Sequence, residues 1–263
     1  MFSNFEKPSR VLPLEGGVNF RDLGGYLNSK DQQVSWRKIF RCGHLGDLTA
    51  TDLDALEHLN VTHVHDFRRE EEQQRTPSQP IRATVYGDYE MSVGSMSKFW
   101  EYMTSEKLTA ESAHDLVVGS YRNCVDDVAP HYTRLFDSLL SPATGSSVFH
   151  CSAGKDRTGM AAALILSALD VNRDTVIDDY LLTIEHFDSD RLMDIVEQHL
   201  RDANVAHWER SWLVPYCSVH RDNIEAFFEG VESRYDSVDN YLSRALGLTP
   251  DKRQQLKSIY LES

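Results

Sequence analysis

The stretch SSVFHCSAGKDRTGMAAALILSALD, residues 146–170, joins a short apolar run to a long helix through a small loop. Val148 and Phe149 predict a strand, and the alanine- and leucine-rich run 160–169 predicts a helix. The first N–H groups of a helix have no partner inside the helix, so a strand–loop–helix junction can bind an anion. The stretch therefore predicts an α/β fold with an anion site at this junction.

The loop itself pairs Cys151 with Arg157 in a C-x5-R arrangement, followed directly by Thr158. Three small residues leave the loop backbone open to a tetrahedral anion: Ser152, Ala153 and Gly154. Consecutive amides can then point at the anion, and the helix dipole adds positive potential at the same place. Arg157 adds a planar fork that binds two phosphate oxygens.

These positive groups also favour the thiolate form of Cys151. A thiolate below a bound phosphate monoester is a nucleophile, and its attack gives a cysteinyl-phosphate that water then hydrolyses. Thr158 can donate a hydrogen bond to the sulfur as it leaves. Because the loop supplies the charge stabilisation itself, we predict no metal and no cofactor.

The segment HCSAGKDRTG (150–159) resembles the HCxxGxxRT signature of cysteine-dependent tyrosine and dual-specificity phosphatases. The Lys155–Asp156 pair narrows the resemblance to the bacterial tyrosine/serine phosphatase family with an AGKDRT loop, which has mycobacterial and Listeria members. Four weaker stretches fit the same family in order: NFRDLGGY (19–26), IFRCGHL (39–45), HDFRRE (65–70) and DDYLLT (178–183).

The resemblance implies a cysteine-phosphatase fold, with a central, mainly parallel sheet flanked by helices, a helical lid and a helical C-terminal part. We place the possible lid at about 91–125. The implied substrate is a phosphorylated protein or peptide or a phosphoinositide. The sequence does not choose among phosphotyrosine, phosphoserine or phosphothreonine, phosphoinositides and inositol phosphates. No WPD-type stretch, which supplies the general acid in classical tyrosine phosphatases, precedes the loop. The resemblance implies that Asp156, within the loop, takes this role.

Three further residues have roles that the sequence leaves open. Asp66, at the end of a predicted strand, is the second candidate for the general acid, or it pairs with Arg68. Lys155 adds a second cation to the site, which suits substrates with more than one phosphate. His150 precedes the nucleophile and is expected to orient the loop backbone by hydrogen bonding.

The rest of the chain predicts one domain over 1–263, because no linker rich in proline or glycine divides it. Strands are expected at 36–42, 61–67, 83–86 and 147–150, and helices at 48–59, 129–140, 160–169 and from 172 onward. The charged run 68–80 is expected to be a solvated loop or a frayed helix. Thr249 and Pro250 predict the start of the last helix.

Composition narrows the partners and the location. With 41 acidic and 27 basic residues, the net charge of −14 disfavours binding to nucleic acid. The four cysteines contain no CxxC pair, which argues against a disulfide framework and a zinc site. No signal-peptide pattern and no transmembrane run are present, so a cytoplasmic location is expected, with signal-independent secretion as the alternative.

Other functions fit the residues less well. A nucleotide-binding Walker loop needs a glycine where Phe149 stands and a Ser or Thr where Asp156 stands. The spacing of His63, His65 and Asp66 is more typical of an ordinary strand than of a metal site. A phosphate-binding pseudoenzyme, a rhodanese-like sulfurtransferase and an inositol-phosphate phosphatase remain the alternatives to a protein phosphatase. The oligomeric state is left open.

Overall fold

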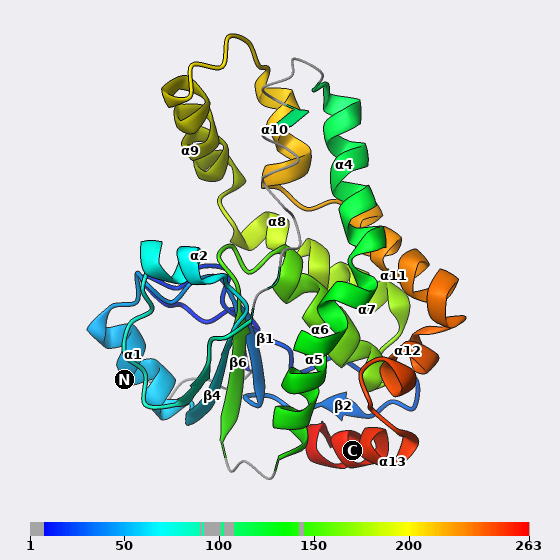
Figure 1. Ribbon diagram of the computed structural model, residues 1–263. Coiled ribbons are helices and arrows are strands. Elements are labelled where there is room, and N and C mark those ends of the chain that lie inside the picture. The colour runs from blue at the N-terminus through cyan, green and yellow to red at the C-terminus, as the bar shows by residue number, and fades with distance from the viewer. Residues whose placement is uncertain (1–7, 90, 92–100, 103–107, 142–144, 263) are drawn as a thin grey trace.

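The computed structural model describes residues 8–89, 91, 101–102, 108–141 and 145–262 (Figure 1). Its centre is a five-stranded sheet in the order β1-β3-β6-β4-β5. The strands are β1 (Arg21–Asp22), β3 (Ile39–Cys42), β6 (Ser146–His150), β4 (Val61–Asp66) and β5 (Thr84–Tyr86). All neighbours pair in parallel except β1, which runs antiparallel to β3. The sheet is therefore mainly parallel, as predicted.

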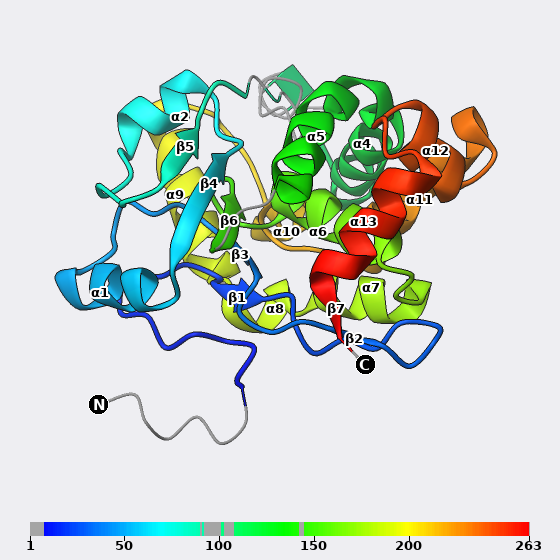
Figure 2. The same ribbon diagram turned by 90° about the horizontal axis from the view of Figure 1, so that it is seen from below.

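Helices cover both faces of this sheet. Figure 2 shows α1 (Ala50–His58) on one side and α5 (Val125–Leu140), α6 (Asp156–Ala168) and α13 (Pro250–Tyr260) on the other. Because helices cover both faces of the sheet, every residue of β3 and β6 is buried, and these strands show no alternation of buried and exposed residues. Helix α6 is buried around most of its circumference, which its run of Ala, Leu and Ile permits.

The C-terminal part is helical, as expected. Its elements are α7 (Arg173–Leu181), α8 (Thr183–His186), α9 (Ser189–Asp202), α10 (Arg210–Cys217), α11 (Arg221–Tyr235), α12 (Val238–Arg244) and α13, followed by the strand β7 (Leu261–Glu262). Thr249 caps α13 and Pro250 is its first residue, as the sequence predicted. Strand β7 pairs antiparallel with β2 (Gln33–Val34) in a separate two-stranded sheet.

Helices α9 and α10, here called the cap, project beside α4 (Ala110–Asn123) beyond the carboxyl edge of the sheet (Figure 1). They share a small core of their own with α4: Leu108, Ala113, Met193, Val196, Leu200, Leu213 and Cys217. Arg210 of α10 reaches across to α9, where it lies 3.1 Å from Asp190 and 2.7 Å from Asp194. The two helices of the cap are thus held to each other independently of the main core.

The differences from the predicted elements are local. Helix α5 begins at Val125, four residues earlier than predicted, because Val125 and Val128 extend its buried face. The charged run 68–80 contains a short helix, α2 (Glu70–Arg75). Of the possible lid at 91–125, residues 92–100 and 103–107 lie outside the described residues, so the lid stays a prediction. Among the described helices, none is long and apolar enough to span a membrane.

Candidate active site

The loop 151–155 leaves the carboxyl end of β6, the middle strand, and leads into α6. Open parallel sheets bind their ligands at this edge. A pocket of about 650 Å³ lies over the loop. Its wall comes from the loop, from α2, from α9 and from the end of α10 at Tyr216.

The first two carbonyl groups of the loop are held by groups outside it. The carbonyl of Cys151 accepts a hydrogen bond from Nδ1 of His150 at 3.1 Å. The carbonyl of Ser152 accepts from the backbone N–H of His44 at 2.9 Å. His150 thus makes the kind of contact that was expected of it, although its role in function stays a prediction.

The next two carbonyl groups are held from beneath the loop. The side-chain amide of Asn19 donates to the carbonyls of Ala153 and Gly154 at 3.2 and 3.0 Å, and Arg41 donates to Gly154 at 3.0 Å. A trans peptide unit directs its N–H opposite to its C=O. Four carbonyls turned outward therefore turn the amides of residues 152–155 toward the pocket, where they form a nest for an anion.

A buried ion pair supports these contacts. Arg41 lies 2.6 Å from Asp179 of α7, and Arg21 donates to the backbone carbonyl of Asp179 and to the side chain of Asn19. Burial alone would raise the pKa of Asp179, but Arg41 and Arg21 hold it below its usual value. The ionised carboxylate keeps Arg41 in place beneath the loop.

Gly154 is required by geometry. Its φ of 67° lies in the left-handed region, and an added Cβ would lie 2.5 Å from the carbonyl of Cys42. A side chain at this position would push the loop away from β3.

Arg157 is oriented by a residue that the sequence analysis missed. Its Nη1 and Nη2 each donate to one oxygen of Glu72 at 2.7 Å, and Nη1 also donates to the carbonyl of Phe67 at 3.0 Å. Ser152 donates to the same carboxylate at 2.6 Å. Among the described residues, no acceptor takes Nε–H or the second Nη2 hydrogen. One edge of the guanidinium thus remains available for two oxygens of an anion.

Glu72 is held as an anion by these contacts. Burial raises the pKa of Glu72, but the hydrogen bonds and charge of Arg157 outweigh it and bring the pKa well below its usual range. In the sequence Glu72 is one of three consecutive glutamates, and nothing in that run distinguishes it.

Cys151 is buried at the base of the pocket, next to Arg157. Burial lowers the pKa of Arg157, but Glu72 and Cys151 both raise it, and the net shift is upward. The hydroxyl of Thr158 is also buried, and no described residue offers it a hydrogen-bond partner. Its one donor hydrogen is therefore not committed to the protein.

Asp156 lines the pocket and is partly exposed. The hydroxyl of Tyr121, from α4, donates to its Oδ1 at 2.5 Å, and Tyr121 in turn lies 2.8 Å from the hydroxyl of Tyr180. Lys155 lies 3.4 Å from the other oxygen. A carboxyl group at the rim, fixed by a tyrosine, is placed to exchange a proton with a bound molecule.

Lys155 connects the loop to the cap. Its ammonium donates to the backbone carbonyls of Tyr216 and Ser218 at 2.5 and 3.1 Å, at the C-terminal end of α10. It also lines the pocket. An anion in the pocket would compete with these two carbonyls for the ammonium.

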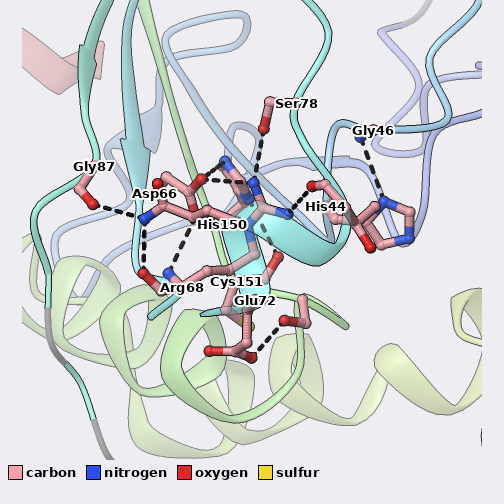
Figure 3. Close-up of polar contacts among 12 residues, drawn as sticks. His44, Gly46, Asp66, Arg68, Glu72, Ser78, Gly87, His150 and Cys151 are labelled. Carbon is pink, nitrogen blue, oxygen red and sulfur yellow. Dashed lines mark hydrogen bonds and ion pairs between the residues drawn. The ribbon is translucent and has the colours of Figure 1, made fainter. Parts of the chain in front are cut away.

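Asp66 lies away from the pocket. Both of its oxygens accept from Arg68, from Nε at 2.9 Å and from Nη2 at 2.7 Å, and Nε2 of His150 lies 3.7 Å away (Figure 3). Arg68 also donates to the carbonyl of Thr76 and so fixes the chain after α2. This is the pairing that the sequence allowed as the alternative to a catalytic role.

His65 also has protein partners. It is buried between the hydroxyls of Tyr89 and Ser138, at 2.7 and 3.1 Å, and stacks on Tyr86. No group of metal-binding side chains is found among the described residues.

Comparisons with known proteins agree on one family. A family model described as "Tyrosine phosphatase family" matches residues 12–262. A Cupriavidus necator protein named as a tyrosine-protein phosphatase is 26% identical over 92% of this chain and 85% of its own. A tyrosine-protein phosphatase of Nostoc commune is 26% identical, covering 82% of this chain and 72% of its own. The triple specificity protein phosphatase PtpB of Mycobacterium tuberculosis is 25% identical over 95% of this chain and 99% of its own.

Proposed function

This chain belongs to the tyrosine phosphatase family, and from that membership we propose that it hydrolyses phosphotyrosine through a cysteinyl-phosphate on Cys151. One observation carries the proposal: the backbone carbonyl groups of residues 151–154 are all held by hydrogen bonds on the side away from the pocket. It directs the loop amides at the position where a phosphoryl group would sit over the sulfur. Such donors are most effective when they are fixed in advance.

In the first step, the Cys151 thiolate attacks phosphorus and a P–S bond forms while the bond from phosphorus to the phenolic oxygen breaks. The free edge of Arg157 and the loop amides bind the non-bridging oxygens as negative charge redistributes among them. Asp156 gives its proton to the departing oxygen. The products of this step are tyrosine and the cysteinyl-phosphate.

In the second step, a water molecule attacks phosphorus and the P–S bond breaks. Asp156, now a carboxylate, takes the proton of the water, and inorganic phosphate leaves. The uncommitted hydroxyl of Thr158 stabilises the thiolate as it departs. Atoms, charge and protons balance without a metal or a cofactor.

Asp156 is our choice for the acid because of its surroundings. It lines the pocket and is held at the rim by Tyr121, whereas both oxygens of Asp66 are taken by Arg68. An acid must reach the bridging oxygen of the substrate, and of these two carboxyl groups only that of Asp156 lines the pocket.

We further propose phosphoserine, phosphothreonine and phosphoinositides as additional substrates, with an inositol-phosphate-directed activity as the alternative. The support is the name of the Mycobacterium tuberculosis relative and the size of the pocket, about 650 Å³. The wall contributed by α9 includes Leu192 and Val196, which suit the aromatic ring of tyrosine.

The test is the rate of p-nitrophenyl phosphate hydrolysis by Cys151→Ser. We expect a loss on the order of 10³-fold or more, with binding of inorganic phosphate retained. Cys124→Ser is the matched control, because Cys124 does not line the pocket. Its sulfur lies 3.3 Å from the carbonyl of Tyr121 and 3.7 Å from the sulfur of Met160, and a hydroxyl can also donate to that carbonyl. Full activity of Cys151→Ser, or inhibition of the wild type by EDTA and not by vanadate, would refute the mechanism.

A further inference from the structure

The pocket differs in charge from the rest of the chain. Five cationic side chains line it: Arg69, Arg75, Lys155, Arg157 and Arg191. Four acidic side chains line it: Asp47, Glu72, Asp156 and Asp188. The pocket therefore has a slight excess of positive side chains in a chain whose net charge is −14.

Three of the four acidic side chains of the pocket have hydrogen-bond partners in the protein. Glu72 is bound by Arg157, and Asp156 by Tyr121. Asp188 caps α9 by accepting from the backbone N–H of Arg191. The fourth, Asp47, lies 3.9 Å from the imidazole of His44.

Two of the cationic side chains have none. Lys155 and Arg157 are engaged as described, and Nε of Arg69 lies 3.5 Å from Glu72. The two that remain are Arg75, in the last turn of α2, and Arg191, in the first turn of α9. Both are exposed, and neither guanidinium has an acidic partner among the residues that the structure describes.

Arg191 lies at the end of α9 where the helix dipole disfavours a positive side chain. The N-terminal end of a helix carries partial positive charge and favours anions, so a cation in the first turn of α9 is locally unfavourable. The field of Arg191 extends across the pocket to the loop after β3. Burial lowers the pKa of His44, and Arg191 contributes in the same direction. A negative group bound at the mouth of the pocket would offset both repulsions.

Arg75 and Arg191 approach the pocket from different elements. Helix α2 lies at the carboxyl edge of the sheet, and α9 rises beyond that edge on the same side of the molecule (Figure 1). The two arginines thus belong to the rim, whereas Arg157 belongs to the base. An anion at the rim would be a second group of the substrate and not the phosphate that reacts.

We infer that Arg75 and Arg191 form an anion subsite that selects phosphotyrosine peptides with an acidic side chain beside the phosphotyrosine. This inference rests on the proposed function and adds a substrate class to it. Guanidinium groups bind carboxylates through paired hydrogen bonds, and the rim is open enough to keep such a side chain partly solvated. The subsite therefore adds selectivity more than affinity.

The charge of the whole chain favours a peptide over a membrane surface. Charges are screened over about 8–10 Å at physiological salt, so a single carboxylate at the rim meets mainly the local arginines. An anionic membrane is an extended surface and meets the negative charge of a large part of the protein.

The test compares two peptides that carry the same non-hydrolysable phosphonate analogue of phosphotyrosine. One has Asp and Glu at the flanking positions, and the other has Asn and Gln. We expect the wild type to bind the acidic peptide about 3- to 10-fold more tightly at low salt, from two exposed ion pairs. Arg75→Ala and Arg191→Ala should each remove much of that ratio. Arg82→Ala, which removes an exposed arginine outside the pocket, should keep it.

A charge reversal sharpens the test. Arg191→Glu should favour a lysine-flanked peptide over the acidic one. Equal affinity of the wild type for both peptides, or an equal ratio in Arg191→Ala and in the wild type, would overturn the inference. So would loss of binding to phosphoinositide vesicles in the two variants with no change toward the peptides.

The binding ratio is independent of turnover. A wild type that prefers the acidic peptide but hydrolyses neither p-nitrophenyl phosphate nor phosphotyrosine would retain the subsite and refute the proposed function. An active enzyme with no preference would do the reverse.

Discussion

Arg157 has five N–H donors, and the protein itself uses three of them. The acceptors are Glu72 and the carbonyl of Phe67, which lie 85 and 90 residues earlier in the chain. This arrangement fixes the plane of the guanidinium before any substrate arrives. Glu72 is therefore a positioning residue for the phosphate-binding edge of Arg157, and it does not itself occupy that edge.

We expect Glu72→Gln to lower kcat/KM for p-nitrophenyl phosphate on the order of 10- to 100-fold, because Arg157 loses its orientation. Steady-state kinetics would measure the loss. The neighbouring Glu71→Gln, which changes the same charge at an exposed position, is the control. An increase in activity would mean instead that Glu72 competes with the substrate for Arg157.

The role of Asp156 predicts a dependence on the leaving group. Asp156→Asn should slow the hydrolysis of alkyl phosphates by about 10²–10⁴-fold, since an alkoxide needs a proton to depart. Aryl phosphates with acidic phenols should be affected far less. Rates for a series of leaving groups would measure this. Asp66→Asn should show no such dependence, and the opposite pattern would place the acid on Asp66.

Tyr121 offers a separate test of the same carboxyl group. Its hydroxyl fixes Oδ1 of Asp156 at the rim, so Tyr121→Phe should leave the carboxyl group less well placed to reach the leaving group. The rate for alkyl phosphates should then fall more than the rate for aryl phosphates with acidic phenols. Tyr180→Phe, which removes only the more distant hydroxyl, should show no such difference. An equal fall for both classes of substrate would indicate a structural role alone.

At the level of the elements, the loop and the cap are coupled through Lys155. Its two bonds to the end of α10 make a link between the phosphate site and the helices above it. We expect Lys155→Met to reduce the hydrogen-exchange protection of the amides of 210–217 and to lower turnover of both simple and complex substrates. A matched control is Lys252→Met, which breaks an exposed ion pair away from the site. A loss confined to substrates with several phosphates would show that Lys155 binds the substrate.

The elements that the sequence predicts well are those with strong local signals. Thr49 and Asp52 form a capping box at the start of α1, and the alanine- and leucine-rich run forms α6. Helix α9 is amphipathic and was expected to be helical, but its position over the pocket depends on packing against α10 and α4. Packing between distant segments leaves no local pattern, so the source of the pocket wall was not predicted.

The residues of the site also differ in whether a local sequence pattern predicts them. The residues of the loop were found because phosphate chemistry demands a compact motif. Asn19 and Arg41, which hold the loop carbonyls, lie more than a hundred residues earlier and act only through tertiary contacts. The stretches 19–26 and 39–45 fit the family resemblance, but the role of these two side chains depends on contacts that only the folded chain makes.

At the scale of the whole molecule, buried histidines predict how stability depends on pH. Burial lowers the pKa of His65 to about 3 and that of His150 to about 4. The unfolded chain takes up these protons near pH 6.5, while the folded chain does not, so stability falls as pH falls below about 6.5. Each pH unit of that difference costs up to about 1.4 kcal/mol per group.

We therefore expect the free energy of unfolding to be lower at pH 5 than at pH 7.5 by a few kcal/mol. Denaturant titrations at several pH values would measure it. His65→Gln, which keeps a polar group near Tyr89 and Ser138, should flatten this dependence. His58→Gln, at an exposed position, should not. A profile that stays flat to pH 5 in the wild type would contradict the burial of these imidazoles.

The pairing of β2 with β7 has a consequence for synthesis of the chain on the ribosome. Val34 is almost fully buried, yet its strand partner, Leu261, lies more than 200 residues later in the chain. At about 5–20 residues per second, roughly 10–45 s pass between the two. During that interval the nascent chain carries an unpaired strand edge and an uncovered apolar side chain, the features that holding chaperones bind. A stop codon that removes β7 would make this temporary exposure permanent.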